Sequence, residues 1–456
     1  MAKYQKYAEY KDSGVEWLGE IPSHWEMWKL SHAYNEIGSG TTPSTSNEEN
    51  FEGDIPWITT GELRENVILD TKKKVSQRTI ELFPTLRKYP SGSVAIAMYG
   101  ATIGRLGIFG IEATTNQACC VMTTSKIFNN KYLFYWLQAF KNEIIQLSSG
   151  GGQPNINQEK VASLKISAPI IKDQITVVDF LDHETAKIDT LITKQEKLIE
   201  LLKEKRQAVI SHAVTKGLNP NVPMKDSGVE WLGEVPEHWK IPRLKQLIRY
   251  GSSISYGIVQ PGDALDEGIP FIQTTNISKG SFELEDFQKT SLSIESNYPR
   301  SRLEGGEVIL GIRASIGAAF VVPMNFKGVN LSRGIARIIP NNLLRSDFLV
   351  WFFKSNAVDQ YWGLSKQGST FSEVSIETVK ELNIVIPPIK EQVDIANYIA
   401  NESSKFEKLM LSAEKQKNLL IERRTALISA AVTGKIDVRY WQHPNQNNNN
   451  NTELSA

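Results

Sequence analysis

Two copies of one stretch decide the fold of this chain: Lys11-Asp-Ser-Gly-Val-Glu-Trp-Leu-Gly-Glu20 and Lys225-Asp-Ser-Gly-Val-Glu-Trp-Leu-Gly-Glu234. The first copy continues as Ile-Pro-Ser-His-Trp25 and the second as Val-Pro-Glu-His-Trp239, so the second begins 214 residues after the first. Self-similarity at a fixed distance is the mark of a repeated structural unit. The chain is therefore expected to contain one unit built twice.

Two long helical runs repeat in the same way. The first begins at Pro169-Ile-Ile-Lys-Asp-Gln174 and ends at Ala208-Val-Ile-Ser-His-Ala-Val-Thr215. The second begins at Pro387-Pro-Ile-Lys-Glu-Gln392 and ends at Ala426-Leu-Ile-Ser-Ala-Ala-Val-Thr433. Proline suits the first turn of a helix, and an acidic residue there is favoured by the helix dipole. Each half is thus a globular stretch followed by a long helix.

Between the repeats, the globular stretches 26–168 and 240–386 agree in pattern more than in identity. Short β-rich runs such as Ile55–Ile58 and Ile269–Ile272 match, and each half has one amphipathic helix and one closing alternating strand, 164–168 or 382–386. The predicted fold class is α/β (α+β), with two similar mixed domains and a pseudo-twofold internal repeat. The predicted segments are a first domain (1–168, with repeat 11–25), a first helix (169–218), a second domain (219–386, with repeat 225–239), a second helix (387–436) and a disordered Asn-rich tail (437–456).

The two helices have the pattern of an antiparallel coiled coil. Apolar residues recur at seven-residue steps, with interruptions at Gln195 and Ala413. A helix of about 44 residues is roughly 66 Å long, too long to pack along one small domain, so the other helix or another chain must cover its stripe. The predicted seam consists of Leu181, Ile188, Leu202, Val209, Ile399, Phe406, Leu420 and Leu427, with Leu191, Leu198 and Leu409 on an adjoining stripe.

Composition narrows the class of protein. The 456 residues are 41% hydrophobic, enough for real cores, and lack the apolar run of about 18 residues that a membrane span needs. The start Met1–Tyr10 is too polar for a signal peptide, and the only cysteines, Cys119 and Cys120, are expected to be buried strand thiols in a reducing cytoplasm. Lys plus Arg equals Asp plus Glu at 51 each, which argues against a nucleic-acid binder that works alone.

The chain resembles the specificity subunit of type I restriction-modification systems in three duplicated features. These are the paired helix starts, the paired helix ends and the paired segments Gly-Val-Glu-Trp-Leu-Gly-Glu-(Ile/Val)-Pro-x-His-Trp. The resemblance covers nearly the whole chain. It implies two target recognition domains that each read one part of a bipartite, gapped double-stranded DNA site. It also implies antiparallel helices that set the gap and dock two methylation subunits.

The resemblance further implies that chemistry belongs to the partners: S-adenosylmethionine and adenine methylation to the methylation subunits, ATP and Mg²⁺ to restriction subunits. This chain is expected to be non-catalytic, with no cofactor or metal, in a prokaryotic cytoplasm. Its one Pro-Pro pair, Pro387-Pro388, lies between isoleucines, so the (Asn/Asp)-Pro-Pro-aromatic tetrapeptide of an amino-methyltransferase is missing, as is a phosphate-binding loop. His24 and His238 are interpreted as packed rather than catalytic histidines.

Candidate DNA-contacting residues follow from loop position and chemistry. Arg and Lys suit guanine, Asn and Gln suit adenine, and Ser, Thr, Lys and Arg suit phosphates. The alternative for each single residue is a solvated surface side chain; Arg105 and Arg313 are favoured because both lie by a repeated Ala-(Thr/Ser)-Ile-Gly segment. The candidates are Thr41, Thr42, Lys72, Lys73, Lys74, Arg78, Tyr99, Arg105, Gln153 and Asn155 in the first domain, and Ser253, Tyr256, Lys279, Arg300, Arg302, Arg313, Arg333, Lys366, Gln367 and Thr370 in the second.

A second class of function remains open at this point. Two domains joined by a coiled-coil spacer also suit a non-catalytic scaffold that binds proteins, and the zero net charge favours that alternative slightly. The family resemblance favours DNA recognition.

Overall fold

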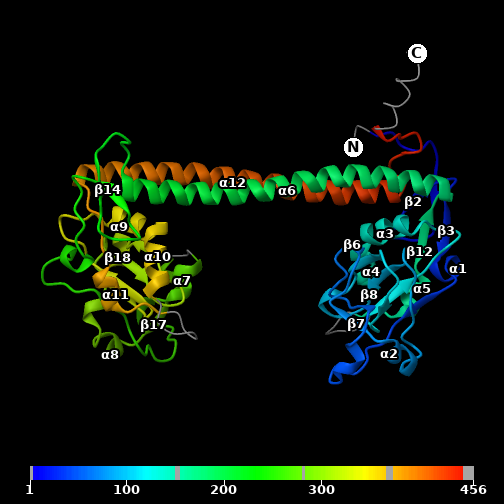
Figure 1. The fold of residues 1–456 in the computed structure, drawn as a ribbon, viewed down its shortest axis with the longest axis horizontal. Coiled ribbons are helices and arrows are strands. Elements are labelled where there is room, and N and C mark those ends of the chain that lie inside the picture. The colour runs from blue at the N-terminus through cyan, green and yellow to red at the C-terminus, as the bar shows by residue number, and fades with distance from the viewer. Residues whose placement is uncertain (1–3, 149–154, 280–282, 366–372, 445–456) are drawn as a thin grey trace, which may run out of the picture. The chain divides into compact units, whose positions relative to one another are not determined.

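The chain forms two compact units, seen in a computed structural model that describes residues 4–148, 155–279, 283–365 and 373–444 (Figure 1). The first unit comprises residues 1–195 and 415–456, and the second comprises residues 196–414. Each unit therefore contains one α/β body together with part of both long helices. The chain leaves the first unit after Gln195 and returns to it at Lys415, so the units do not coincide with consecutive segments of the sequence.

The long helices are α6 (Ile171–Lys216) and α12 (Ile389–Val432). In the first unit Arg424 Nε donates to Asp189 Oδ1 at 2.7 Å, and in the second Arg206 lies 3.2 Å from Glu407. From Asp189 to Arg206 the chain advances 17 residues along α6, while the partner position moves back by 17 along α12, as antiparallel pairing requires. The predicted antiparallel pair is present within each unit.

The seven-residue seam is buried or half-buried along its length. Leu181, Ile188 and Ile399 are at most 4% exposed; Leu202, Val209, Phe406, Leu420 and Leu427 are half-buried. The adjoining stripe was predicted wrongly, because two helices bury a single seam and leave the flanking positions to solvent. Leu191, Leu198 and Leu409 are 44%, 43% and 54% exposed.

Each helix start is anchored by a buried glutamine of the repeated motif. Gln174 Nε2 donates to Ile127 O at 2.8 Å and to Pro169 O at 2.9 Å, and Gln174 Oε1 accepts from Asn129 N at 2.8 Å. Gln392 makes the same three bonds, with Leu343 O, Pro387 O and Arg345 N, at 2.8–2.9 Å. Burying an amide is tolerated only when its donors and acceptor are satisfied. The repeated glutamine thus ties each long helix to its own body.

The repeated segments fold into two identical hairpins. Strands β1 (Tyr10–Asp12) and β2 (Glu20–Pro22) pair antiparallel, as do β13 (Met224–Asp226) and β14 (Glu234–Pro236). Trp25 and Trp239 follow the hairpins and are fully buried. The packed-histidine interpretation was wrong, because His24 and His238 beside them are exposed; His238 Nε2 lies 2.8 Å from Glu391 Oε1 in the first turn of α12.

Each body contains one larger sheet and one three-stranded sheet, and the strand orders correspond except that β6 extends the larger sheet of the first body. The larger sheets run in the orders β4-β11-β8-β9-β6 and β15-β21-β18-β19. The smaller three-stranded sheets place a central strand between one parallel and one antiparallel neighbour. The first unit's strands are β4 (Ile37–Ser39), β5 (Ile55–Ile58), β6 (Asn66–Ile68), β7 (Lys73–Val75), β8 (Val94–Ala97), β9 (Leu106–Phe109), β10 (Thr114–Thr115) and β11 (Cys119–Met122). The second unit's are β15 (Ser255–Tyr256), β16 (Ile269–Ile272), β17 (Gln288–Thr290), β18 (Val308–Gly311), β19 (Ala319–Val321), β20 (Asn330–Leu331) and β21 (Ile335–Ile338).

Helices cover the large sheets on the side of the long helices. Helix α3 (Asn130–Ala139) packs on β8 and β9, and α9 (Ser346–Phe353) packs on β18 and β19. The main core of each unit therefore combines residues of the large sheet, of the short helix on it and of the long helices. A smaller core in each unit consists mainly of residues from the strands and their loops. The remaining helices are α1 (Leu30–Ala33), α2 (Gln77–Leu82), α4 (Lys141–Gln146), α5 (Gln158–Ser163), α7 (Thr274–Lys279), α8 (Leu292–Glu295), α10 (Asn356–Ser365) and α11 (Ile376–Glu381).

The closing strand exists in one unit only. In the first unit β12 (Lys165–Ala168) pairs with β3 (Glu26–Lys29). In the second unit residues 240–243 and 382–386 make only isolated bridges, which corrects the prediction of a strand over 382–386. Pro242 lies in the middle of the facing segment and has no N–H to donate, so a continuous ladder cannot form there.

Two expectations drawn from composition can be compared directly with the structure. Cys119 and Cys120 are buried, unpaired strand residues, as predicted, and burial raises the pKa of the Cys120 thiol to about 12. Within the described ranges, no helix combines the length and apolarity needed to cross a membrane.

A glycine in each unit lies where two strands cross too closely for a side chain. A Cβ on Gly40 would collide with the carbonyl oxygen of Thr115, and one on Gly257 with that of Leu331. These two glycines are structural counterparts, because Thr41 N donates to Thr115 O and Ile258 N donates to Leu331 O.

We expect Gly257→Ala to lower the free energy of unfolding by about 1–3 kcal/mol, because the added methyl meets backbone that cannot move aside cheaply. Urea unfolding of the full chain measures this. Gly363→Ala is the matched control: Gly363 lies in α10 with nothing within 4 Å of an added Cβ, so stability should stay the same or rise slightly. An equal loss in both variants would show that close approach at Gly257 is not the cause.

Candidate nucleic-acid interface

In the first unit, loops from both sheets meet at one edge of the body. Thr41 N donates to Thr115 O at 3.0 Å, and Asn116 N donates to Ile58 O at 3.0 Å, which brings the ends of β4, β5 and β10 together. We call this group of polar loop residues the first loop edge: Thr41, Thr42, Tyr99, Asn116, Gln117 and Asn155.

Residues of the first loop edge bond to one another through side chains and backbone. Thr42 Oγ1 donates to Gln117 Oε1, and Tyr99 forms a β-bridge with Asn155. Burial is the main cause that raises the pKa of Tyr99, and a hydrogen bond from Gln117 acts against it. The phenol therefore stays neutral and can donate or accept a hydrogen bond. The structure brings together four predicted residues here and adds Asn116 and Gln117, which sequence reasoning missed.

The lysine run lies partly at this edge. Lys72 N donates to Glu62 Oε1 at 3.1 Å, and Glu62 also accepts from Thr59 at the end of β5, so Lys72 is beside the loop edge. Lys73 Nζ lies 4.8 Å from the centre of the Phe51 ring, and Lys74 is 3.1 Å from Asp70. These contacts give Lys73 and Lys74 roles within the domain.

The two remaining first-unit candidates lie apart from each other. Arg78 is exposed on α2, whereas Arg105 is half-buried on the hairpin that also carries Tyr99, where Ala97 N donates to Arg105 O at 2.8 Å. Lys74 also has a counterpart that sequence comparison did not find. It faces Pro56 in the β5–β7 pair, just as Lys289 faces Pro270 in the β16–β17 pair.

The second unit places two arginines around one glutamate at the equivalent edge. Arg313 Nε lies 3.8 Å and Arg333 Nη2 4.0 Å from Glu373 Oε2, and Arg313 forms a β-bridge with Glu373. The side chains of Arg313, Arg333 and Glu373 are 34%, 48% and 39% exposed. We call these three residues the second loop edge. Glu373 was missed because no local pattern in its sequence distinguishes it from a surface carboxylate.

The two bodies match models of one known family over residues 22–201 and 236–423, described as the type I restriction modification DNA specificity domain. The chain belongs to this family. The specificity subunit of EcoBI from Escherichia coli is 24% identical over 73% of this chain and 71% of its own length. That of MjaIX from Methanocaldococcus jannaschii is 23% identical over 96% of this chain and 99% of its own.

Solved structures share the fold. One, from a study of complex assembly and conformational transition of the type I R-M system, has a TM-score of 0.71 at 15% identity and covers 91% of this chain and 99% of its own. The HsdS subunit from Thermoanaerobacter tengcongensis has a TM-score of 0.54 at 15% identity and covers 93% of this chain and 100% of its own. The two-domain architecture predicted from the sequence is thus the family's fold.

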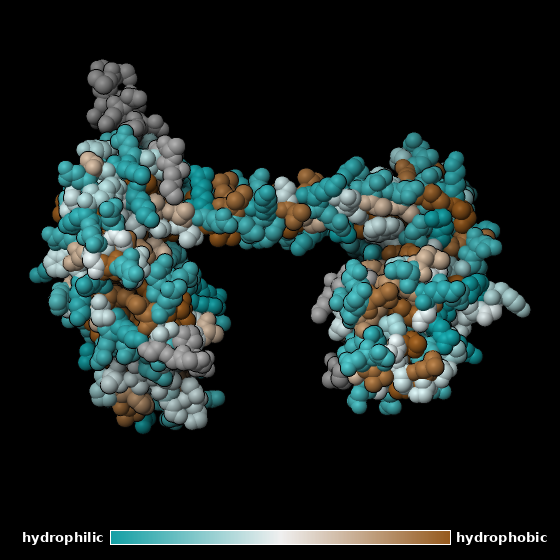
Figure 2. All heavy atoms as spheres, turned by 180° about the vertical axis from the view of Figure 1, so that it is seen from behind, coloured by the Kyte–Doolittle hydropathy of each residue, from teal (hydrophilic) through white to brown (hydrophobic). Residues whose placement is uncertain are grey.

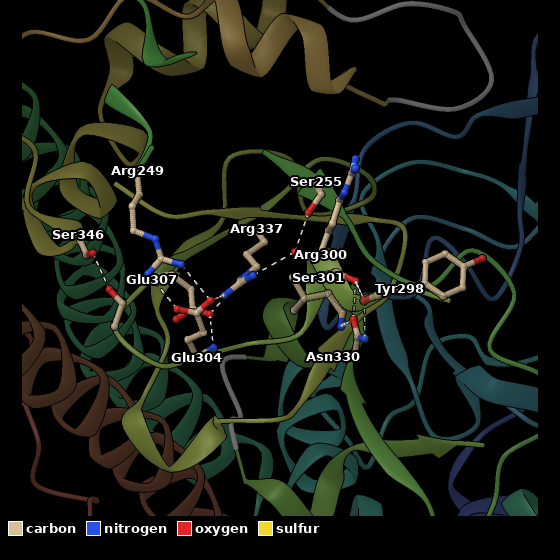
Figure 3. Close-up of polar contacts among 12 residues, drawn as sticks. Arg249, Ser255, Tyr298, Arg300, Ser301, Glu304, Glu307, Asn330, Arg337 and Ser346 are labelled. Carbon is tan, nitrogen blue, oxygen red and sulfur yellow. Dashed lines mark hydrogen bonds and ion pairs between the residues drawn. The ribbon is translucent and has the colours of Figure 1, made fainter. Parts of the chain in front are cut away.

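The second specificity domain also contains an ionic network of residues that were not among the predicted DNA contacts (Figure 3). Arg249 and Arg337 both contact Glu304, at 3.0 and 2.9 Å, and lower its pKa to about 2, with the Arg249 hydrogen bond as the larger cause. Arg337 also binds the buried Glu307 at 3.1 Å. These arginines are neutralised by carboxylates and hold the domain together.

Three of the predicted DNA-contacting residues lie near this network. Ser253 lines a cavity of about 340 Å³ with Arg249, Arg300 and Glu304. The carbonyl oxygen of Arg300 accepts from Ser255 Oγ at 3.0 Å and from Arg337 at 3.1 Å, while its side chain points away from Glu304 (Figure 3). Tyr256 is 50% exposed on the edge strand β15.

The prediction for Arg302 needs correction. Its guanidinium makes two hydrogen bonds, at 2.7 and 2.6 Å, to Glu295, whose side chain is 1% exposed. Arg302 therefore neutralises a buried carboxylate. Four candidates, Gln153, Lys366, Gln367 and Thr370, lie outside the described residues, as do the side chain of Lys279 and residues 445–456 of the predicted tail. The prediction of disorder from 437 is wrong for 437–444, because Val438 is 3% exposed in the first core and Trp441 packs on Phe180. In the part of the chain that the structure describes, no group of His, Cys, Asp and Glu could hold a metal ion.

We expect Arg302→Ala to lower the free energy of unfolding at pH 7 by about 3 kcal/mol, because Glu295 stays buried without its cation. The Arg302 hydrogen bond is the largest cause that lowers the pKa of Glu295, so this stabilisation is present above the usual glutamate pKa and lost as the pH falls below it. The difference between variant and parent should shrink from pH 7 to pH 3.5 in urea unfolding. Arg300→Ala is the control and should change stability little; equal stability of Arg302→Ala and parent would contradict the structural role.

Proposed function

We propose that this chain is the DNA sequence-specificity subunit of a type I restriction-modification complex, and that each loop edge reads one half of a bipartite DNA site. One observation carries the proposal: a single backbone frame occurs twice in a chain of the DNA specificity domain family, and its loop edges carry different polar side chains. Reading different base sequences requires different hydrogen-bonding groups in similar positions.

The chain's part in the reaction is recognition. In this proposal two methylation subunits bind S-adenosylmethionine and methylate adenine, and restriction subunits, where present, use ATP and Mg²⁺ to cleave. Support comes from the relatives, whose names describe specificity subunits of type I restriction enzymes, and from the solved structure that concerns assembly of such a system. The proposed function places the chain with its DNA substrate in a prokaryotic cytoplasm.

The long helices would serve both spacing and docking. Helices α6 and α12 are continuous over 46 and 44 residues. Each is therefore stiff enough to act as a ruler, meaning that it sets the length of the unspecified DNA between the two half-sites. Their outer faces carry apolar side chains among charged ones, visible as brown patches on a teal surface in Figure 2. Exposed examples are Leu191, Leu198, Leu201, Leu409, Leu411, Leu419 and Ile421. Such residues suit contact with a partner protein.

We expect the isolated chain to bind DNA weakly, because a net charge of zero releases few counterions. Gel shift with a duplex containing the site should give a Kd above about 1 µM for the chain alone at physiological salt. The complex with methylation subunits should bind at about 10 nM or tighter and discriminate against a scrambled site. Nanomolar, sequence-specific binding by the chain alone would contradict this prediction.

A second prediction concerns the ruler. Four residues inserted after Gln195 and four after Glu414 lengthen each helix by about 6 Å, and base pairs repeat every 3.4 Å. Methylome sequencing should show a gap longer by about two base pairs, with both half-sites unchanged. Alanine at the exposed Lys194 and Glu196 is the control and should leave the gap unchanged. An active insertion variant that keeps the original gap would show that the helices are not the ruler.

A further inference from the structure

Backbone hydrogen bonds define three positions that coincide in the two units. In the first unit Met98 N donates to Ala118 O and Ile156 N donates to Met98 O, both at 2.8 Å. In the second unit Ile312 N donates to Gly334 O at 2.9 Å and Val374 N donates to Ile312 O at 2.8 Å. The neighbouring residues are thereby matched in pairs: Tyr99 with Arg313, Gln117 with Arg333, and Asn155 with Glu373.

This matching differs from the one that sequence suggests. Arg105 and Arg313 lie by the same short motif, but the counterpart of Arg313 is Tyr99. The three pairs are separated by 214, 216 and 218 residues, because the loops between them differ in length. A fixed sequence offset therefore cannot find all three.

The framework around the three positions is alike, whereas their side chains differ completely. Met98 and Ile312 are both buried, as are Ile156 and Val374, and a small residue occupies the place of Ala118 in each unit. If the three positions served only packing, similar surroundings would favour similar side chains. Instead the first unit has a phenol and two amides, and the second has two guanidiniums and a carboxylate.

These side chains are accessible and carry groups that distinguish bases. Gln117 and Asn155 are exposed, and their amides match the donor and acceptor of adenine in the major groove. Arg313 and Arg333 match the two acceptors of guanine. Glu373 Oε2 lies 3.8 Å from Arg313 Nε and 4.0 Å from Arg333 Nη2, so one carboxylate holds the two guanidiniums near one another.

We propose that these three matched positions determine base specificity: Arg313 and Arg333, held by Glu373, read guanine in one half-site, and Gln117 and Asn155 read adenine in the other. The proposal rests on the proposed function, because it assigns bases to the loop edges of a DNA-reading subunit. It names the side chains that set which sequence each unit accepts.

The test uses the full chain assembled with its methylation subunits and reads the methylated motif by methylome sequencing. In Arg333→Gln, one guanine of one half-site should be relaxed or replaced by adenine, with the other half-site unchanged. Competition gel shifts should show discrimination at that base pair reduced by about 5- to 150-fold. The reciprocal Gln117→Arg should shift one position of the opposite half-site towards guanine.

Two further variants separate base reading from general effects. Arg333→Lys keeps the charge without the planar fork, so it should retain affinity but lose discrimination at the same base pair. Arg345→Gln is the matched control, because Arg345 is a similarly exposed arginine paired with Asp347 ahead of α9, and its motif should stay unchanged.

The outcomes distinguish the two levels of inference. An Arg333→Gln complex that binds with unchanged discrimination, or that changes the opposite half-site, overturns the assignment while leaving the proposed function standing. If the parent complex itself methylates no defined sequence, the proposed function fails. If a variant complex assembles but does not methylate DNA, the competition gel shifts test the assignment instead. Unchanged discrimination at the base pair would then overturn it.

Discussion

The buried amide at the start of each long helix is the interaction on which the rest of the structure depends. Gln174 and Gln392 each satisfy one backbone donor and two backbone acceptors while fully buried. Loss of either side chain would leave buried backbone groups unpaired, which costs more than an ordinary hydrogen bond contributes. This bond fixes where each helix leaves its body. It explains why the short motif around the glutamine is repeated almost unchanged.

The structure separates residues that hold the fold from residues that select a ligand. Framework positions such as Gly40 and Gly257 are constrained by the close approach of neighbouring backbone, so they are the same in both units. Loop-edge positions such as Gln117 and Arg333 lie on that frame with exposed side chains, where substitutions are expected to change stability little. A subunit with this division can change its target sequence without having to rebuild its core.

Charge is arranged to favour specificity over general affinity for DNA. Two arginines of the second unit are already paired with carboxylates: Arg302 with buried Glu295, and Arg249 with Glu304. Such pairs stabilise the domain but contribute little positive electrostatic potential at its surface. Arg313 and Arg333 share Glu373 at 3.8 and 4.0 Å, beyond hydrogen-bond distance, so exchanging this partner for a base edge costs less than breaking the hydrogen-bonded pairs.

The sequence by itself determined the duplication, the mixed α/β bodies and the seam from Leu181 to Leu427, because repeats and seven-residue spacing are local patterns. The sequence did not predict that Leu191 and Leu198 are exposed, because their burial depends on how many helices pack against each long helix. Only the tertiary structure paired Tyr99 with Asn155 and Arg313 with Glu373, or removed Arg302 from the interface. The first two relations join segments tens of residues apart through backbone bonds, and the third depends on the burial of Glu295, so no local pattern encodes them.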